Sequence, residues 1–68
     1  MNDSARLRRI RMERKLSQRK LARELGMSQG AYWKIENGKM KLTTDRLIAL
    51  CRFYHLSADY LIGLTDKE

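Results

Sequence analysis

The feature that most constrains the fold is a repeated punctuation of the chain by hydroxyl residues and glycines. Ser and Thr are good helix N-caps, because their side-chain oxygen accepts a hydrogen bond from a free backbone N–H group of the first turn. Glycine commonly follows a helix end, where the backbone turns left-handed. Between these signals apolar residues recur at helical spacing, and no segment alternates with a period of two. The sequence therefore predicts an all-α fold of five short helices.

Single residues specify most of the predicted boundaries. The first helix begins at Asp3 or Ser4 and runs to about Lys15. The other four helices are expected to begin at N-caps Ser17, Ser28, Thr43 or Thr44, and Ser57. Stop signals follow the second, third and fifth helices at Gly26, Gly38 and Gly63.

The length of 68 residues allows one hydrophobic core. A chain of this size buries roughly 60% of its unfolded surface, so we expect residues 1–68 to form a single domain. No apolar run is long enough to span a membrane. The single cysteine, Cys51, cannot form an internal disulfide, and with the single histidine, His55, it cannot complete a zinc site. We expect a cytoplasmic protein with a reduced thiol and no metal or other cofactor.

Positive charge is concentrated in the first part of the chain. Residues 1–41 hold 12 of the 15 cationic and 4 of the 8 anionic side chains, a net charge of +8, whereas residues 42–68 have a net charge of −1. Such asymmetry suggests a polyanionic partner on one side of the molecule. DNA, RNA and an anionic membrane surface all fit this charge, and so does a solvated basic face that serves only solubility.

The most informative segment is residues 17–38, SQRKLARELGMSQGAYWKIENG, which predicts a helix, a tight turn and a second helix. Two helices joined in this way form a helix-turn-helix, whose second helix fits the major groove of DNA. Ser28 lies at the N-terminus of that helix, which attracts phosphate. Gln29 can present a donor and an acceptor to an adenine edge. Lys34, about one and a half turns further on, can contact a guanine or a phosphate.

The chain resembles the Cro/C1-type (XRE family) helix-turn-helix repressors of phages and bacteria. Two stretches carry the resemblance, LRRIRMERKLSQRKLARELGMSQGAYWKIENGK and LIALCRFYHLSADYLIGLTD, which together cover about residues 6 to 66. Each motif is weak alone, but their order is specific. The resemblance implies a compact, lambda-repressor-like DNA-binding domain of five helices.

The resemblance also implies roles for individual residues. It suggests that Gln18 contacts a phosphate and that a structural ion pair joins Arg11 to Glu36. Three positions are expected to face base edges: Gln29, Gly30 and Lys34. Backbone contacts are implied for Asn37 and Lys39, and the position of Lys41 in the same loop makes it a further phosphate candidate.

Four positions depart from the pattern of the family. Gly30 lacks the side chain with which many relatives read a base, and it lowers helix propensity by roughly 1 kcal/mol relative to Ala. Trp33 either contacts DNA beside the base-reading positions or covers the edge of the core. Leu42 lies near a position that often holds proline. His55 replaces the usual Gly or Asn after the fourth helix, so a left-handed non-glycine residue is expected there.

The remaining aromatic and apolar side chains suggest a second surface. Tyr32 lies on the inner face of the third helix and is expected in the core. Phe53, Tyr60 and Leu64 exceed what so small a core needs, so they are candidates for a dimer interface on the C-terminal part.

We therefore interpret the sequence as a sequence-specific, double-stranded DNA-binding transcriptional regulator, most simply a repressor. It would bind a palindromic operator as a homodimer. An antitoxin that also binds its own promoter is the main alternative, followed by binding of RNA or a membrane surface. An enzyme is disfavoured, because the chain shows no paired carboxylates, catalytic triad or metal cluster. No site for a small-molecule effector is visible in the sequence.

Overall fold

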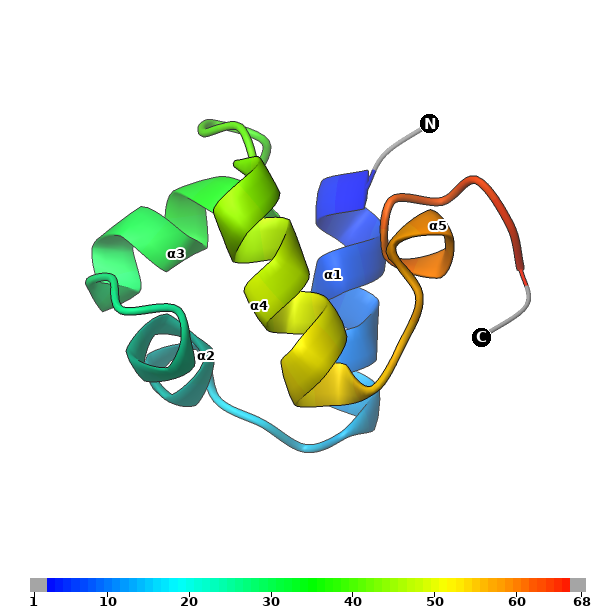
Figure 1. The fold of residues 1–68 in the computed structure, drawn as a ribbon. Coiled ribbons are helices and arrows are strands. Elements are labelled where there is room, and N and C mark those ends of the chain that lie inside the picture. The colour runs from blue at the N-terminus through cyan, green and yellow to red at the C-terminus, as the bar shows by residue number, and fades with distance from the viewer. Residues whose placement is uncertain (1–2, 67–68) are drawn as a thin grey trace.

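A computed structural model describes residues 3–66 of the chain and shows an all-helical domain. No strand occurs among the described residues. Figure 1 shows α3 on one side of the molecule and α5 with the C-terminal segment on the opposite side. The helices are α1 (Asp3–Glu13), α2 (Gln18–Glu24), α3 (Gln29–Glu36), α4 (Thr44–Tyr54) and α5 (Ala58–Leu61). The five-helix, all-α prediction is confirmed.

Each of the last four helices begins at a side-chain N-cap. The hydroxyl oxygens of Ser17, Ser28 and Ser57 accept hydrogen bonds from backbone N–H groups three residues later, at 3.0, 3.1 and 3.1 Å. Thr43 caps α4 in the same way at 3.3 Å, which decides between the two threonines left open by the sequence. These caps satisfy backbone donors that would otherwise have no partner within the helix.

The helices end in left-handed turns, as the glycine pattern predicted. Gly26 and Gly38 have φ angles of 68° and 71°. In both turns the backbone N–H group of the residue after the glycine donates a hydrogen bond to the carbonyl oxygen five residues earlier. This bond closes the last helical turn. His55 adopts φ 57° after α4, so the expected left-handed histidine is confirmed.

The end of α1 differs from the sequence prediction. The helix stops at Glu13, two residues before the expected end, and Lys15 lies in the left-handed region at φ 57°. The N–H group of Leu16 donates to the Arg11 carbonyl at 3.1 Å, in the same type of turn that follows α2 and α3. The Leu16 side chain packs against the core, and this contact explains why the helix closes early without a glycine.

The core is formed by residues from every helix. α2 packs against α3, α3 also packs against α1, and α5 lies against both α1 and α4. Tyr32 is fully buried, which confirms its predicted place in the core. The buried apolar residues are Leu7, Ile10, Leu21, Ala22, Tyr32, Ile35, Leu50, Tyr54, Leu56, Tyr60 and Leu61.

Candidate nucleic-acid interface

The helix-turn-helix is built by α2, α3 and the turn between them. Leu21 and Ala22 of α2 are buried, as are Tyr32 and Ile35 of α3, so apolar side chains hold the two helices at a set angle. Gly26 provides the left-handed residue that the short turn requires. This packing leaves the opposite face of α3 uncovered.

The uncovered face of α3 carries the three positions expected to face base edges and also Trp33, the further base-reading candidate. Gln29, Gly30 and Lys34 are exposed, and Trp33 exposes 45% of its surface. Their spacing places them along one stripe of a helix with 3.6 residues per turn. A Cβ atom built on Gly30 would have no neighbour within 4 Å, so its missing side chain leaves the backbone of α3 openly accessible. The stripe therefore combines polar side chains, an indole and bare backbone.

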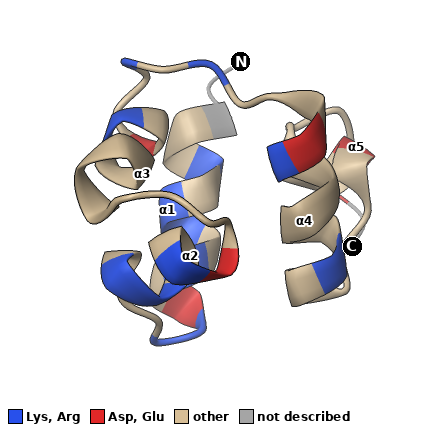
Figure 2. Cartoon of the chain, turned by 60° about the vertical axis from the view of Figure 1, so that its left-hand side comes forward, with Lys and Arg blue, Asp and Glu red and all other residues tan. Residues whose placement is uncertain are grey.

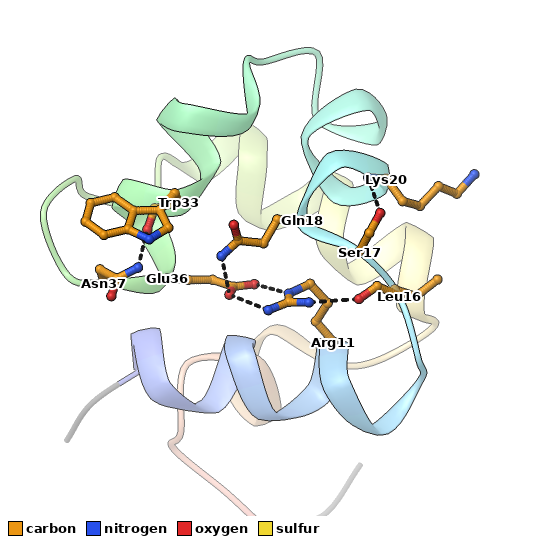
Figure 3. Close-up of polar contacts among 8 residues, drawn as sticks. All are labelled: Arg11, Leu16, Ser17, Gln18, Lys20, Trp33, Glu36 and Asn37. Carbon is orange, nitrogen blue, oxygen red and sulfur yellow. Dashed lines mark hydrogen bonds and ion pairs between the residues drawn. The ribbon is translucent and has the colours of Figure 1, made fainter.

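A two-point ion pair joins α1 to the end of α3 behind this stripe. The Arg11 guanidinium donates from Nε to Glu36 Oε2 at 2.7 Å and from Nη2 to Oε1 at 3.1 Å. Its third nitrogen, Nη1, donates to the Leu16 carbonyl at 2.8 Å. The Glu36 side chain is fully buried and that of Arg11 is 12% exposed. The pair thus has both the geometry and the burial of a structural contact (Figure 3).

The ionisation of this cluster follows from its contacts. Burial alone would raise the pKa of Glu36, but hydrogen bonds from Arg11 and Gln18 outweigh burial, and the net effect lowers that pKa. Burial, together with the adjacent Glu36 carboxylate, raises the pKa of the Tyr32 phenol. Burial also raises the pKa of Tyr54 to about 12. Glu36 is therefore a carboxylate at neutral pH, and both phenols remain protonated.

Gln18 joins the same cluster, a contact that the sequence did not predict. Its side-chain Nε2 donates to Glu36 Oε1 at 3.3 Å (Figure 3). The amide group is therefore oriented by a residue of α3, eighteen positions along the chain. No pattern within the sequence signals such a pairing, because it depends on how α2 and α3 pack.

The residues predicted to contact phosphate surround the stripe on α3. Ser28 is exposed at the start of α3, and its hydroxyl, which accepts from Ala31, still has a proton to donate. The Asn37 side-chain amide donates to the Trp33 carbonyl at 2.8 Å and so fixes its orientation at the other end. Lys39 and Lys41 are exposed in the loop that follows. Figure 2 shows cationic segments on α1, α2 and this loop, whereas α4 and α5 carry few.

The match to known proteins agrees with this geometry. A profile of the helix-turn-helix family matches residues 7–61. The chain belongs to the XRE-type family of helix-turn-helix transcriptional regulators. It is 39% identical over 61 residues to YobD, an uncharacterised helix-turn-helix-type transcriptional regulator of Bacillus subtilis (strain 168). The alignment covers 90% of this chain and 54% of YobD, so the chain spans about half the length of that relative. No solved structure matches the chain.

The three dimer candidates of this XRE-type domain lie in different environments. Leu64 is 68% exposed. Phe53 is half-buried, with its ring edge-on to Tyr54 at a centroid separation of 5.1 Å. Tyr60 is only 8% exposed, so the expectation that its ring exceeds the needs of the core is corrected. It packs beneath Arg6, whose guanidinium carbon lies 4.9 Å from the ring centroid.

Two other predicted features can be compared with the described part of the domain. Within residues 3–66, no helix has the length and apolar character needed to cross a membrane. Over the same residues, no group of His, Cys, Asp and Glu side chains is arranged to hold a metal ion. Cys51 is a partly buried free thiol packed against the core.

Proposed function

We propose that this chain binds double-stranded DNA in a sequence-specific manner by placing α3 in the major groove. The observation that supports this most directly is the uncovered stripe on α3. Gln29 offers a donor and an acceptor suited to adenine, and Lys34 offers a cation suited to guanine or phosphate. Trp33 adds an apolar surface suited to a thymine methyl group or a deoxyribose. Gly30 allows the backbone of α3 to approach the bases closely.

Phosphate contacts would supply most of the affinity. Gln18 and Ser28 lie at the N-terminal ends of α2 and α3, where free N–H groups favour an anion. Asn37, Lys39 and Lys41 lie beyond the C-terminal end of α3, so they and Ser28 bracket the base-reading stripe, whereas Gln18 lies beside Glu36 at the C-terminal end. The net charge of +8 on residues 1–41 makes this binding strongly dependent on salt.

We propose further that the protein acts in the cytoplasm as a homodimeric repressor of a palindromic operator. In such a dimer the two copies of α3 would enter successive major grooves roughly 34 Å apart. Two exposed apolar side chains, Ile48 and Leu64, lie within residues 42–68, whose net charge is −1. Their position in the part of the chain without excess positive charge supports a dimer surface away from the DNA. Occupation of a promoter would then block transcription.

Selection of bound sequences from a random duplex pool tests this function. We expect recovery of a two-fold symmetric sequence with half-sites one helical turn apart. Recovery of an asymmetric site would refute the symmetric dimer but not DNA binding. No enrichment over the starting pool would refute sequence-specific binding itself.

A further inference from the structure

A surface groove lies between α1 and the C-terminal end of α3. Its volume is about 690 Å³, and it is open to solvent. Its lining from α1 includes Ala5, Arg8, Met12 and Glu13, and its lining from the end of α3 is Glu36, Asn37 and Gly38. None of these α1 residues has a role in the function proposed above.

The chemistry of the groove fits an anion attached to an apolar group. Arg8 is exposed and forms no ion pair with the described side chains of residues 4–66. Arg9 Nη1 lies 3.9 Å from Glu13 Oε2. This ion pair is exposed and therefore contributes little to stability. Met12 is 56% exposed and Ala5 is also exposed, so the groove has an apolar lining beside its cations. A deoxyribose next to a phosphate has this combination of properties.

The position of the groove connects it to α3. Asn37 borders both the groove and the exposed stripe of α3. Figure 3 shows Gln18, Glu36 and Asn37 in a row between the helix-turn-helix and α1. A DNA strand that passes the exposed Asn37 would enter the groove beside α1.

We propose that this groove binds the sugar–phosphate backbone next to the base pairs contacted by α3, with Arg8 as a phosphate ligand. The inference rests on the proposed DNA-binding function and extends its contact surface to α1. The planar Arg8 guanidinium can donate two parallel hydrogen bonds to one phosphate. Met12 and Ala5 provide a surface for the adjacent sugar. A polypeptide occupant is disfavoured, because it would compete with DNA for the edge formed by Asn37.

Phosphate-ethylation interference on a duplex selected from the random pool tests the proposal. In the wild-type complex, ethylation of a phosphate just outside the contacted base pairs should reduce binding. In the Arg8→Gln variant, ethylation of the same phosphate should not reduce binding any further. Arg52→Gln is the matched control, since Arg52 is also exposed but lies on α4. Arg8→Gln should weaken binding several-fold and lower the slope of log affinity against log salt by about 1.

The variants also separate a contact from a general effect of charge. Arg8→Lys retains the charge but loses the paired geometry, so we expect partial recovery of affinity. Equal effects of Arg8→Gln and Arg52→Gln, with unchanged interference at the flanking phosphates, would overturn the groove proposal while DNA binding stands. If the wild-type chain enriches no sequence and binds no duplex, the proposed function fails and the groove proposal fails with it.

Discussion

The Arg11 guanidinium donates to both carboxylate oxygens of Glu36, at 2.7 and 3.1 Å, and thereby joins α1 to the C-terminal end of α3. The same carboxylate accepts a hydrogen bond from Gln18 at 3.3 Å. One buried side chain thus connects three helices directly behind the proposed DNA-binding stripe. The orientation of α3 depends on this connection as well as on apolar packing.

Glu36→Ala should destabilise the domain strongly, because it leaves the Arg11 cation largely buried without its partner. Removing one member of a buried pair costs about 3 kcal/mol or more, and each kcal/mol lowers the Tm of a domain this small by roughly 4–8 °C. Thermal unfolding followed by circular dichroism measures the loss. Glu24→Ala is the control, since its pair with Lys20 is solvent-exposed and exposed pairs contribute about 0.3–0.5 kcal/mol. Equal Tm values for the two variants would contradict a structural role for Glu36.

Acid should remove the stabilisation that Glu36 provides. Its pKa is lower in the folded state than the ordinary value of 4.5, so the folded state favours the carboxylate. The contribution is therefore fully present above about pH 4.5 and is lost as the pH falls through the lower, folded-state pKa. Urea unfolding across this pH range measures the free energy of unfolding of wild type and of Glu36→Gln. The difference between the two values should become smaller as the pH falls. A difference that stays constant would contradict the lowered pKa.

Gln29→Ala and Lys39→Ala should affect DNA binding differently. Gln29 lies on the proposed base-reading stripe, so its loss should weaken binding to the selected operator and change the preference for one base by about 1–3 kcal/mol. Lys39 lies in the loop after α3, so its loss should weaken all duplexes similarly. Competition binding against single-base operator variants separates the two effects. An unchanged base preference in Gln29→Ala would remove Gln29 from the recognition surface.

Gly30→Ala should stabilise the fold while it tests the need for close backbone approach. The new methyl group would meet nothing within 4 Å, and Ala is favoured over Gly inside a helix by about 1 kcal/mol. Gly26→Ala is the matched control: its site is equally open, but its φ of 68° is unfavourable for Ala. We expect Tm to rise in the first variant and fall in the second. Weaker operator binding by the more stable Gly30→Ala would show that DNA approaches the bare backbone.

Leu64→Glu should shift the proposed dimer toward monomer, because a charge would replace an apolar side chain that is 68% exposed. Sedimentation equilibrium measures the dissociation constant. Met12→Glu is the control, since Met12 is also an exposed apolar residue but lies on α1. A monomeric wild type, or equal dissociation constants for wild type and Leu64→Glu, would remove Leu64 from the interface.

Local signals were sufficient to predict the helices of this protein. An N-cap such as Ser28 and a stop such as Gly38 act within a few residues, through backbone hydrogen bonds that any helix end requires. The exposed stripe of α3 was predictable for the same reason, since helical periodicity places Gly30 and Lys34 opposite the buried Tyr32 and places Gln29 and Trp33 on the flank beside them.

Tertiary structure decided the features that depend on residues far apart in sequence. The Arg11–Glu36 pair was expected only from the family resemblance, and its link to Gln18 was not expected, because no local periodicity relates positions on three helices. The early end of α1 depends on the packing of Leu16, and the burial of Tyr60 depends on the packing of α5 against α1 and α4. Composition and spacing specify which face of a helix is apolar, but packing alone specifies which distant side chain covers it.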